Sequence, residues 1–116
     1  TKNFHVVEKG ELYRSAQLRR EELNLAIDEA GMRTVINLRG EAPGKDWFDT
    51  EVAVAKERGV ELVNIPMRSE AIPRRADLIK LLDAYKSVAR PILIHCQFGA
   101  DRTGEAAAIY QMEYLG

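Results

Sequence analysis

The sequence predicts an α/β protein in which a central, mostly parallel sheet of four to five strands is flanked by helices. Short apolar segments rich in β-branched residues alternate along the chain with longer segments whose apolar residues recur at helical spacing. Each expected connection between strands contains a helix, and crossovers of that length return the chain in the same direction, so the strands are expected to be parallel. Ligands of such sheets bind beyond the carboxyl ends of the strands.

The first half of the chain contains two expected strands and two expected helices. Residues 12–15 predict a short strand at an edge of the sheet, and residues 34–38 predict a buried strand. Between them, residues 19–30 place leucine, isoleucine and alanine at helical spacing and are followed by a glycine, which is a common helix stop. A second helix is expected over residues 46–58, with Asp46 as its N-cap.

The second half repeats this alternation. Residues 60–65 predict a strand, and residues 74–89 predict a helix with one apolar stripe. Residues 91–94 form a compact apolar segment without charge, as expected of a central strand. A last helix is expected to begin near Arg102. In the helix expected over residues 46–58, Trp47 and Phe48 are interpreted as residues that anchor the helix in the core rather than as a platform for substrate.

Composition narrows the class of protein. The chain has 116 residues, of which 46% are apolar and 30% charged, which predicts one globular domain over residues 1–116. A net charge of −1 argues against binding to nucleic acid, and no apolar run approaches the roughly 20 residues of a membrane span. One cysteine excludes an internal disulfide and a four-cysteine zinc site. We expect a monomer. The cytoplasm is slightly favoured as its location, and removal of an upstream signal would allow a periplasmic or secreted protein.

The segment from His95 to Gly104 joins the last apolar strand to the last helix. A tight loop that enters a helix N-terminus turns successive backbone N–H groups toward one point, and the helix dipole adds positive potential there. Such a loop binds anions, and a guanidinium in the first turn of the helix can contact two phosphate oxygens. The residues expected to bind phosphate in this way are Gln97, Phe98, Gly99, Ala100, Asp101 and Arg102.

The positive potential of the loop and the helix N-terminus also acts on Cys96, the first residue of the loop. A free thiol is mostly protonated at neutral pH, but a helix N-terminus and nearby cations lower its pKa. Cys96 is therefore expected to be a thiolate nucleophile beneath the bound phosphate. The Thr103 hydroxyl is expected to stabilise the thiolate, and His95 is expected to organise the loop by hydrogen bonding rather than to act as a base.

The residues His95, Cys96, five further residues, Arg102 and Thr103 match the His-Cys-x5-Arg-Ser/Thr signature of the protein tyrosine phosphatase superfamily. The sequences Leu-Tyr-Arg-Ser-Ala-Gln at 12–17 and Thr-Val-Ile-Asn-Leu-Arg at 34–39 resemble the opening segments of compact bacterial phosphatases of the dual-specificity type. The resemblance extends over nearly the whole chain and implies a dual-specificity-phosphatase-like fold. Because such enzymes carry further helices after the loop, it also implies that the chain is truncated at its C-terminus.

The resemblance implies hydrolysis of phosphomonoesters through a phosphocysteine, without a metal or other cofactor. Cys96 would attack phosphorus, Arg102 and the loop would hold the oxygens, and water would then release phosphate. The expected substrates are phosphotyrosine or phosphoserine/threonine of a protein, or a small phosphomonoester. The alternative is a catalytically weak or inactive module of the same fold that binds phosphate or a phosphoprotein.

The residue that protonates the leaving group is left open. The resemblance implies an aspartate on a loop before the cysteine, but residues 67–73 contain only one carboxylate, that of Glu70. Glu70 is therefore the first candidate for the general acid and Asp101 the second. A group of the substrate or water is the third.

Overall fold

The computed structural model describes residues 2–68 and 73–116. Its five strands form one sheet in the order β1-β2-β5-β3-β4. β1 runs antiparallel to β2, and all other neighbouring strands are parallel. The mostly parallel sheet predicted from the sequence is therefore confirmed. The strands are β1 (His5–Glu8), β2 (Leu12–Ser15), β3 (Thr34–Asn37), β4 (Glu61–Asn64) and β5 (Ile92–His95).

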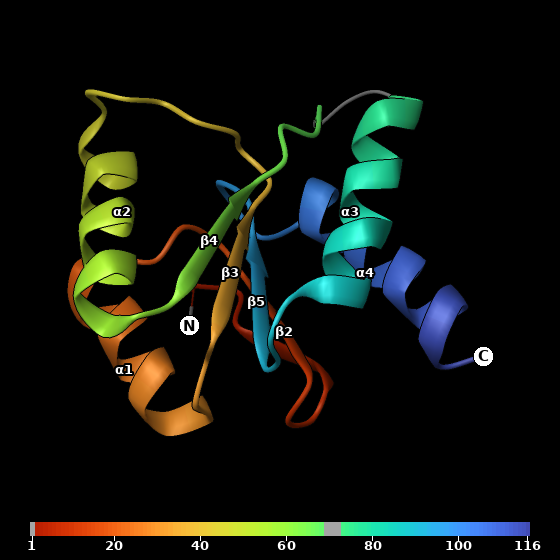
Figure 1. The fold of residues 1–116 in the computed structure, drawn as a ribbon, viewed down its shortest axis with the longest axis horizontal. Coiled ribbons are helices and arrows are strands. Elements are labelled where there is room, and N and C mark those ends of the chain that lie inside the picture. The colour runs from red at the N-terminus through yellow and green to blue at the C-terminus, as the bar shows by residue number, and fades with distance from the viewer. Residues whose placement is uncertain (1, 69–72) are drawn as a thin grey trace.

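Helices cover both faces of the sheet (Figure 1). α1 (Arg20–Ala30) and α2 (Asp46–Arg58) pack on one face, and α3 (Arg75–Ser87) and α4 (Asp101–Tyr114) pack on the other. None of the described helices has the length and apolar character needed to cross a bilayer.

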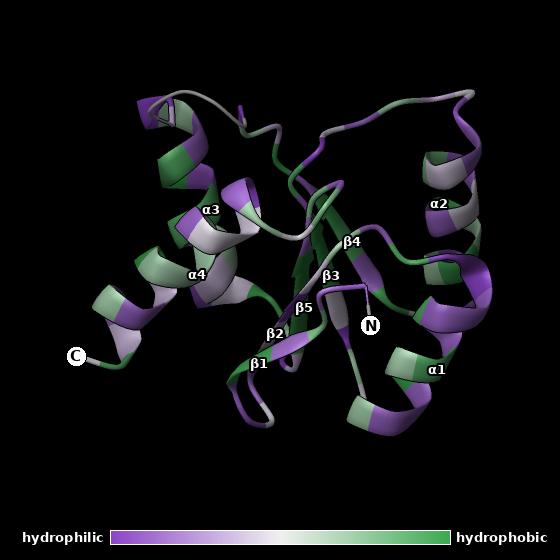
Figure 2. Ribbon diagram, turned by 180° about the vertical axis from the view of Figure 1, so that it is seen from behind, coloured by the Kyte–Doolittle hydropathy of each residue, from purple (hydrophilic) through white to green (hydrophobic). Residues whose placement is uncertain are grey.

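The two helical layers explain the apolar sequence of the central strand. Successive side chains of a strand point to opposite faces of the sheet. In β5, Ile92 and Ile94 join the core beside α3 and α4, whereas Leu93 joins the core beside α1 and α2. Figure 2 accordingly shows the central strands as mostly hydrophobic and the helices as mixed. A strand covered on both faces needs an apolar residue at each position, so it reads as a continuous apolar run.

Two expectations about individual elements are wrong. Residues 12–15 are not an edge strand, because β2 lies between β1 and β5. The edge is β1, whose Val6 is 56% exposed and gives little apolar signal. Asp46 is not the N-cap of α2 but its first residue. The Asp49 carboxylate instead accepts a hydrogen bond, 3.2 Å long, from the N–H of Gly44 before the helix.

The strand register brings three chain segments to one place. Ser15 at the end of β2 and Asn37 at the end of β3 both pair with His95 at the end of β5. The segments that follow these three parallel strands therefore leave the sheet at the same level. The loop after β5 lies between the segment after β2 and the segment after β3, and this arrangement builds the site.

Candidate active site

The loop between β5 and α4 is held from outside through its carbonyl groups. Three successive carbonyls each accept a hydrogen bond from the N-terminal part of the chain: Gln97 O from Gln17 N (3.2 Å), Phe98 O from Asn3 Nδ2 (2.7 Å) and Gly99 O from Arg14 Nη2 (3.3 Å). In a planar trans peptide the carbonyl and the next N–H point in opposite directions. The N–H groups of residues 98–100 are therefore turned away from these partners and toward the inside of the loop.

Cys96 lies at the bottom of this loop and is 2% exposed. The Gly99 N–H donates to Cys96 Sγ over 3.2 Å, and Thr103 Oγ1 lies 3.8 Å from the same sulfur. Burial alone raises the pKa of the thiol, but hydrogen bonds from the backbone of Thr103 and Gly99 and from the Thr103 hydroxyl outweigh it, so the pKa is lowered. The surroundings of Cys96 therefore favour the thiolate.

Gly99 is required by the close approach of two segments. Its φ of +73° lies in the left-handed region. A Cβ at this position would lie 2.5 Å from the backbone nitrogen of Ala16. The loop can therefore rest against the end of β2 only where no side chain is present.

Arg102 is the second residue of α4 and is half-buried at the mouth of the loop. Its Nε is fully buried and makes no hydrogen bond with any residue of the described ranges. A buried guanidinium N–H without a partner is costly. An anion bound in the loop would satisfy it.

His95 contacts a buried carboxylate that sequence reasoning missed. Its Nε2 lies 2.7 Å from Oε2 of Glu51 on α2, and both side chains are almost fully buried. Its other ring nitrogen, Nδ1, lies 3.5 Å from the carbonyl of Cys96. The pair thus connects α2 to the start of the loop. Helical spacing gave a usable signal, because Glu51 lies between the buried residues Phe48 and Ala55 on the inward face of α2.

Gln17 connects this pair to a second basic residue. Its Nε2 donates to Oε2 of Glu51 over 3.2 Å, and its Oε1 accepts a 3.1 Å hydrogen bond from Nη1 of Arg39. Arg39 follows β3, while Gln17 follows β2. A chain of polar contacts therefore runs from the end of β3 to the foot of the loop.

Of the two residues predicted as proton donors, only Asp101 lies within the ranges that the structure describes. Glu70 lies outside the described ranges. Asp101 is the first residue of α4 and is exposed beside the loop. Asp77 is buried in the first turn of α3, where its Oδ2 lies 3.1 Å from Nε of Arg74. Asp77 is therefore a paired charge at the start of α3.

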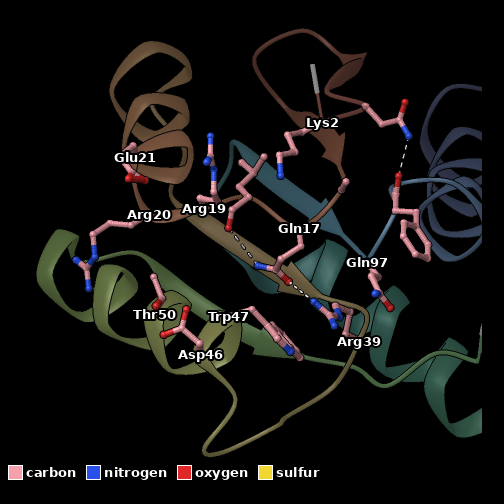
Figure 3. Close-up of a pocket in the computed structure, with 14 residues that line it drawn as sticks. Lys2, Gln17, Arg19, Arg20, Glu21, Arg39, Asp46, Trp47, Thr50 and Gln97 are labelled. Carbon is pink, nitrogen blue, oxygen red and sulfur yellow. Dashed lines mark hydrogen bonds between the residues drawn. The ribbon is translucent and has the colours of Figure 1, made fainter.

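A cavity of about 1020 Å³ opens beside the loop (Figure 3). Gln97 and Phe98 form its border with the loop, and Arg39 and Trp47 line it from the sheet edge and from α2. Phe48 is buried as predicted, but the prediction that Trp47 anchors the core is wrong. Its ring is partly exposed and carries the Arg39 guanidinium, whose carbon lies 3.6 Å from the ring centroid.

A parallel sheet whose central strand leads through a cysteine-headed loop into a helix is the arrangement of the protein tyrosine phosphatase superfamily. The family model described as "DSP-PTPase phosphatase fused to NAD+ Kinase" matches residues 2–114. The chain therefore belongs to this family, and the resemblance to compact phosphatases of the dual-specificity type is confirmed.

Solved structures of phosphatases share the fold. The core catalytic domain of the PP-IP phosphatase SIW14 from S. cerevisiae is 28% identical, with a TM-score of 0.79 over 95% of this chain. A cysteine-to-serine variant of TpbA from P. aeruginosa in complex with pTyr is 22% identical (TM-score 0.71, 96% of this chain), and PTPMT1 is 18% identical (TM-score 0.73, 95% of this chain). The matches cover 65%, 63% and 71% of those chains, so this chain is shorter than each of them. Comparison with curated proteins finds no significant match.

Proposed function

We propose that the chain is a cysteine-dependent phosphatase that hydrolyses phosphomonoesters through a phosphocysteine intermediate. The observation that carries the proposal is the combination, around one thiol, of the Gly99 N–H that donates to Cys96 Sγ and the buried Nε of Arg102, which has no hydrogen-bond partner among the described residues. Together these groups would form a site for a dianion next to a nucleophile. The substrate would be a phosphorylated protein side chain, phosphotyrosine or phosphoserine/threonine, or a small phosphomonoester.

The reaction divides into two displacements at phosphorus. The Cys96 thiolate attacks phosphorus, an S–P bond forms, and the ester P–O bond breaks as the leaving oxygen takes a proton. Water then attacks phosphorus, the S–P bond breaks, and orthophosphate and the thiolate are released. Arg102 and the N–H groups of residues 97–102 would hold the three equatorial oxygens throughout, so charge is stabilised by fixed donors and no metal is needed.

Three side chains would support these steps without bonding to phosphorus. The Thr103 hydroxyl would stabilise the thiolate as attacker and as leaving group. His95 would keep the start of the loop in place through its contacts with Glu51 and with the Cys96 carbonyl. Glu70, or alternatively Asp101, would give the proton to the leaving oxygen.

The similarity to SIW14, described as a PP-IP phosphatase, supports hydrolysis at phosphorus. The second candidate is a phosphate-binding module without turnover. It is favoured by the sequence of residues 67–73, the loop expected to carry the acid, which contains no aspartate.

The decisive experiment measures release of p-nitrophenolate from p-nitrophenyl phosphate. We expect turnover by the wild type, a loss of at least about 10⁴-fold in Cys96→Ser, and a loss of about 10²- to 10³-fold in Arg102→Lys, which keeps the charge but not the two-pronged contact. Arg33→Lys, an exposed position outside the site, serves as the control. A wild type that binds vanadate but releases no phenolate would establish the binding module instead.

The proton donor is assigned by comparing Glu70→Gln and Asp101→Asn across pH with an aryl and an alkyl phosphate. The variant that lacks the acid should lose the decline of kcat at high pH and should lose more activity on the alkyl phosphate, whose leaving group is more basic. If both variants keep the wild-type profile, neither residue is the acid, and the proton comes from the substrate or from water.

A further inference from the structure

The cavity beside the loop is where the remainder of a substrate would lie. It borders the loop at Gln97 and Phe98 and extends from there between the ends of two strands and the start of α2. In Figure 3, Lys2, Gln17, Arg39 and Trp47 surround this space. Its volume of about 1020 Å³ is at the upper limit of small-molecule sites.

Arg39 is the basic residue best placed to bind a ligand there. Its backbone N–H donates to Asn37 Oδ1 over 3.0 Å, its guanidinium donates to Gln17, and the plane of the guanidinium covers the Trp47 ring. These contacts fix its direction, and within residues 2–68 and 73–116 they use one of its five side-chain N–H donors. An arginine held in this way loses little conformational freedom when it binds.

The charge of Arg39 has no carboxylate partner within 4.0 Å among the residues that the structure describes. Burial and then the positive charge of Arg102 lower the pKa of its guanidinium, and the negative charge of Glu51 opposes this. The positive charges of Arg39 and Arg102 therefore repel each other, and an anion bound close to both would relieve this repulsion.

The other basic residues of the cavity have carboxylates nearby. Lys2 and Arg19 share the carboxylate of Glu22 at 3.9 Å and 3.4 Å, and Arg20 lies 2.9 Å from Glu57. Each of these three cations therefore has a carboxylate within 4.0 Å, although Lys2 and Arg19 share one. Arg39 differs from them in having no such carboxylate among the residues that the structure describes.

We propose that this cavity is a second anion subsite, in which Arg39 binds a phosphate group other than the one held by the loop. The ligand is a small molecule with two phosphate groups, joined either as a diphosphate or as two separate esters. The proposal rests on the proposed function in one respect, namely that the loop binds the first phosphate.

The test is a binding measurement on Cys96→Ser, in which turnover cannot interfere. Calorimetric titration with orthophosphate, pyrophosphate and fructose 1,6-bisphosphate should give dissociation constants at least about tenfold lower for one or both two-phosphate ligands, the size of one charge-assisted hydrogen bond. Tighter binding of pyrophosphate alone would indicate that the ligand is a diphosphate. Tighter binding of fructose 1,6-bisphosphate alone would indicate that it carries two separate phosphate esters. Adding Arg39→Gln should reduce this preference to about twofold or less, whereas adding the exposed Arg33→Gln should preserve it.

Equal affinity for all three ligands would overturn the subsite. So would a loss of affinity in Arg39→Gln that is as large for orthophosphate as for the two-phosphate ligands. Circular dichroism checks that each variant folds, and Trp47→Leu, which removes the surface under the guanidinium, gives a second route to the same loss. The proposed function is judged separately by turnover of p-nitrophenyl phosphate, which has a single phosphate. If the protein hydrolyses p-nitrophenyl phosphate but shows no preference for two-phosphate ligands over orthophosphate, only the subsite is refuted.

Discussion

At the scale of single residues, Gly99 decides whether the loop can close against β2. Alanine here would combine a left-handed backbone with a contact of 2.5 Å to Ala16 N, so one of the two segments must move. We expect Gly99→Ala to lower the free energy of unfolding by about 1–3 kcal/mol. The displaced N–H groups should lower kcat/KM for p-nitrophenyl phosphate by about 10²-fold or more.

Gly10 provides the matched control for that change. Its φ of +79° is also left-handed, but no atom lies within 4 Å of the position of a Cβ. Gly10→Ala should therefore cost about 1 kcal/mol of backbone strain and leave kcat/KM unchanged. Similar losses of activity in both variants would show that strain, rather than the approach of the loop to β2, is responsible.

Glu51 is predicted to position His95 and, through it, the loop. Glu51→Ala would remove the carboxylate that lies 2.7 Å from His95 Nε2 and that accepts a hydrogen bond from Gln17 Nε2, which should cost about 1–3 kcal/mol of unfolding free energy. Glu51→Gln keeps an acceptor oxygen of the same size and should recover part of this loss. Chemical denaturation and kcat/KM are measured for both variants, and the two quantities should recover together.

Glu57 on the same helix is the control for the loss of a negative charge. It forms an exposed ion pair with Arg20, and such pairs contribute about 0–1 kcal/mol. Glu57→Ala should therefore change stability little. If Glu51→Ala behaves in the same way, the buried contact with His95 has no positioning role.

At the scale of the element, the start of α4 sets the ionisation of Cys96. The lowered pKa means that the folded state favours the thiolate more than the unfolded chain does. This contribution to stability is fully present above the ordinary thiol pKa of about 8.5 and is lost as the pH falls through the lower pKa of the folded protein. Below that value the thiol is protonated in both states and the contribution vanishes.

Thr103→Val tests this coupling. Valine keeps the shape of threonine but removes the hydroxyl that lies 3.8 Å from the sulfur, so the pKa of the thiol should rise. The ultraviolet absorbance of the thiolate, measured as a difference from Cys96→Ser, reports the titration without ambiguity because the chain has one cysteine. A midpoint at or above that of an ordinary thiol in the wild type would contradict the prediction.

The elements also show what the sequence could and could not predict. β5, α4 and the intervening loop follow from local signals, namely an apolar run, a glycine and an arginine at a helix start. β1 was missed because an exposed edge strand with a charged residue has no alternation to detect. The roles of Glu51 and Trp47 depend on which face of α2 meets the loop and the cavity, and that is fixed by packing against a segment more than thirty residues away along the chain.

At the scale of the whole molecule, Arg90 ties together elements from both ends of the chain. Its Nη1 donates to Glu11 Oε1 over 3.1 Å and to the Tyr110 hydroxyl over 2.6 Å, and its Nη2 donates to the Tyr85 carbonyl over 3.0 Å. The guanidinium also lies over the rings of Tyr110 and Tyr114. It therefore connects the segment before β2 to α3 and α4, the helix that carries Arg102.

Arg90→Met should lower the free energy of unfolding by about 2–4 kcal/mol, because methionine fills the space but leaves the Tyr110 hydroxyl and the Glu11 carboxylate without this partner. Arg33→Met, at an exposed position, should change stability by less than about 0.5 kcal/mol. Because Arg90 contacts the second half of α4, hydrogen exchange should accelerate there first, while the amides of β3 and β5 stay protected until global unfolding. Uniform acceleration across the sheet and α4 would mean that Arg90 stabilises the fold as a whole and does not anchor this helix in particular.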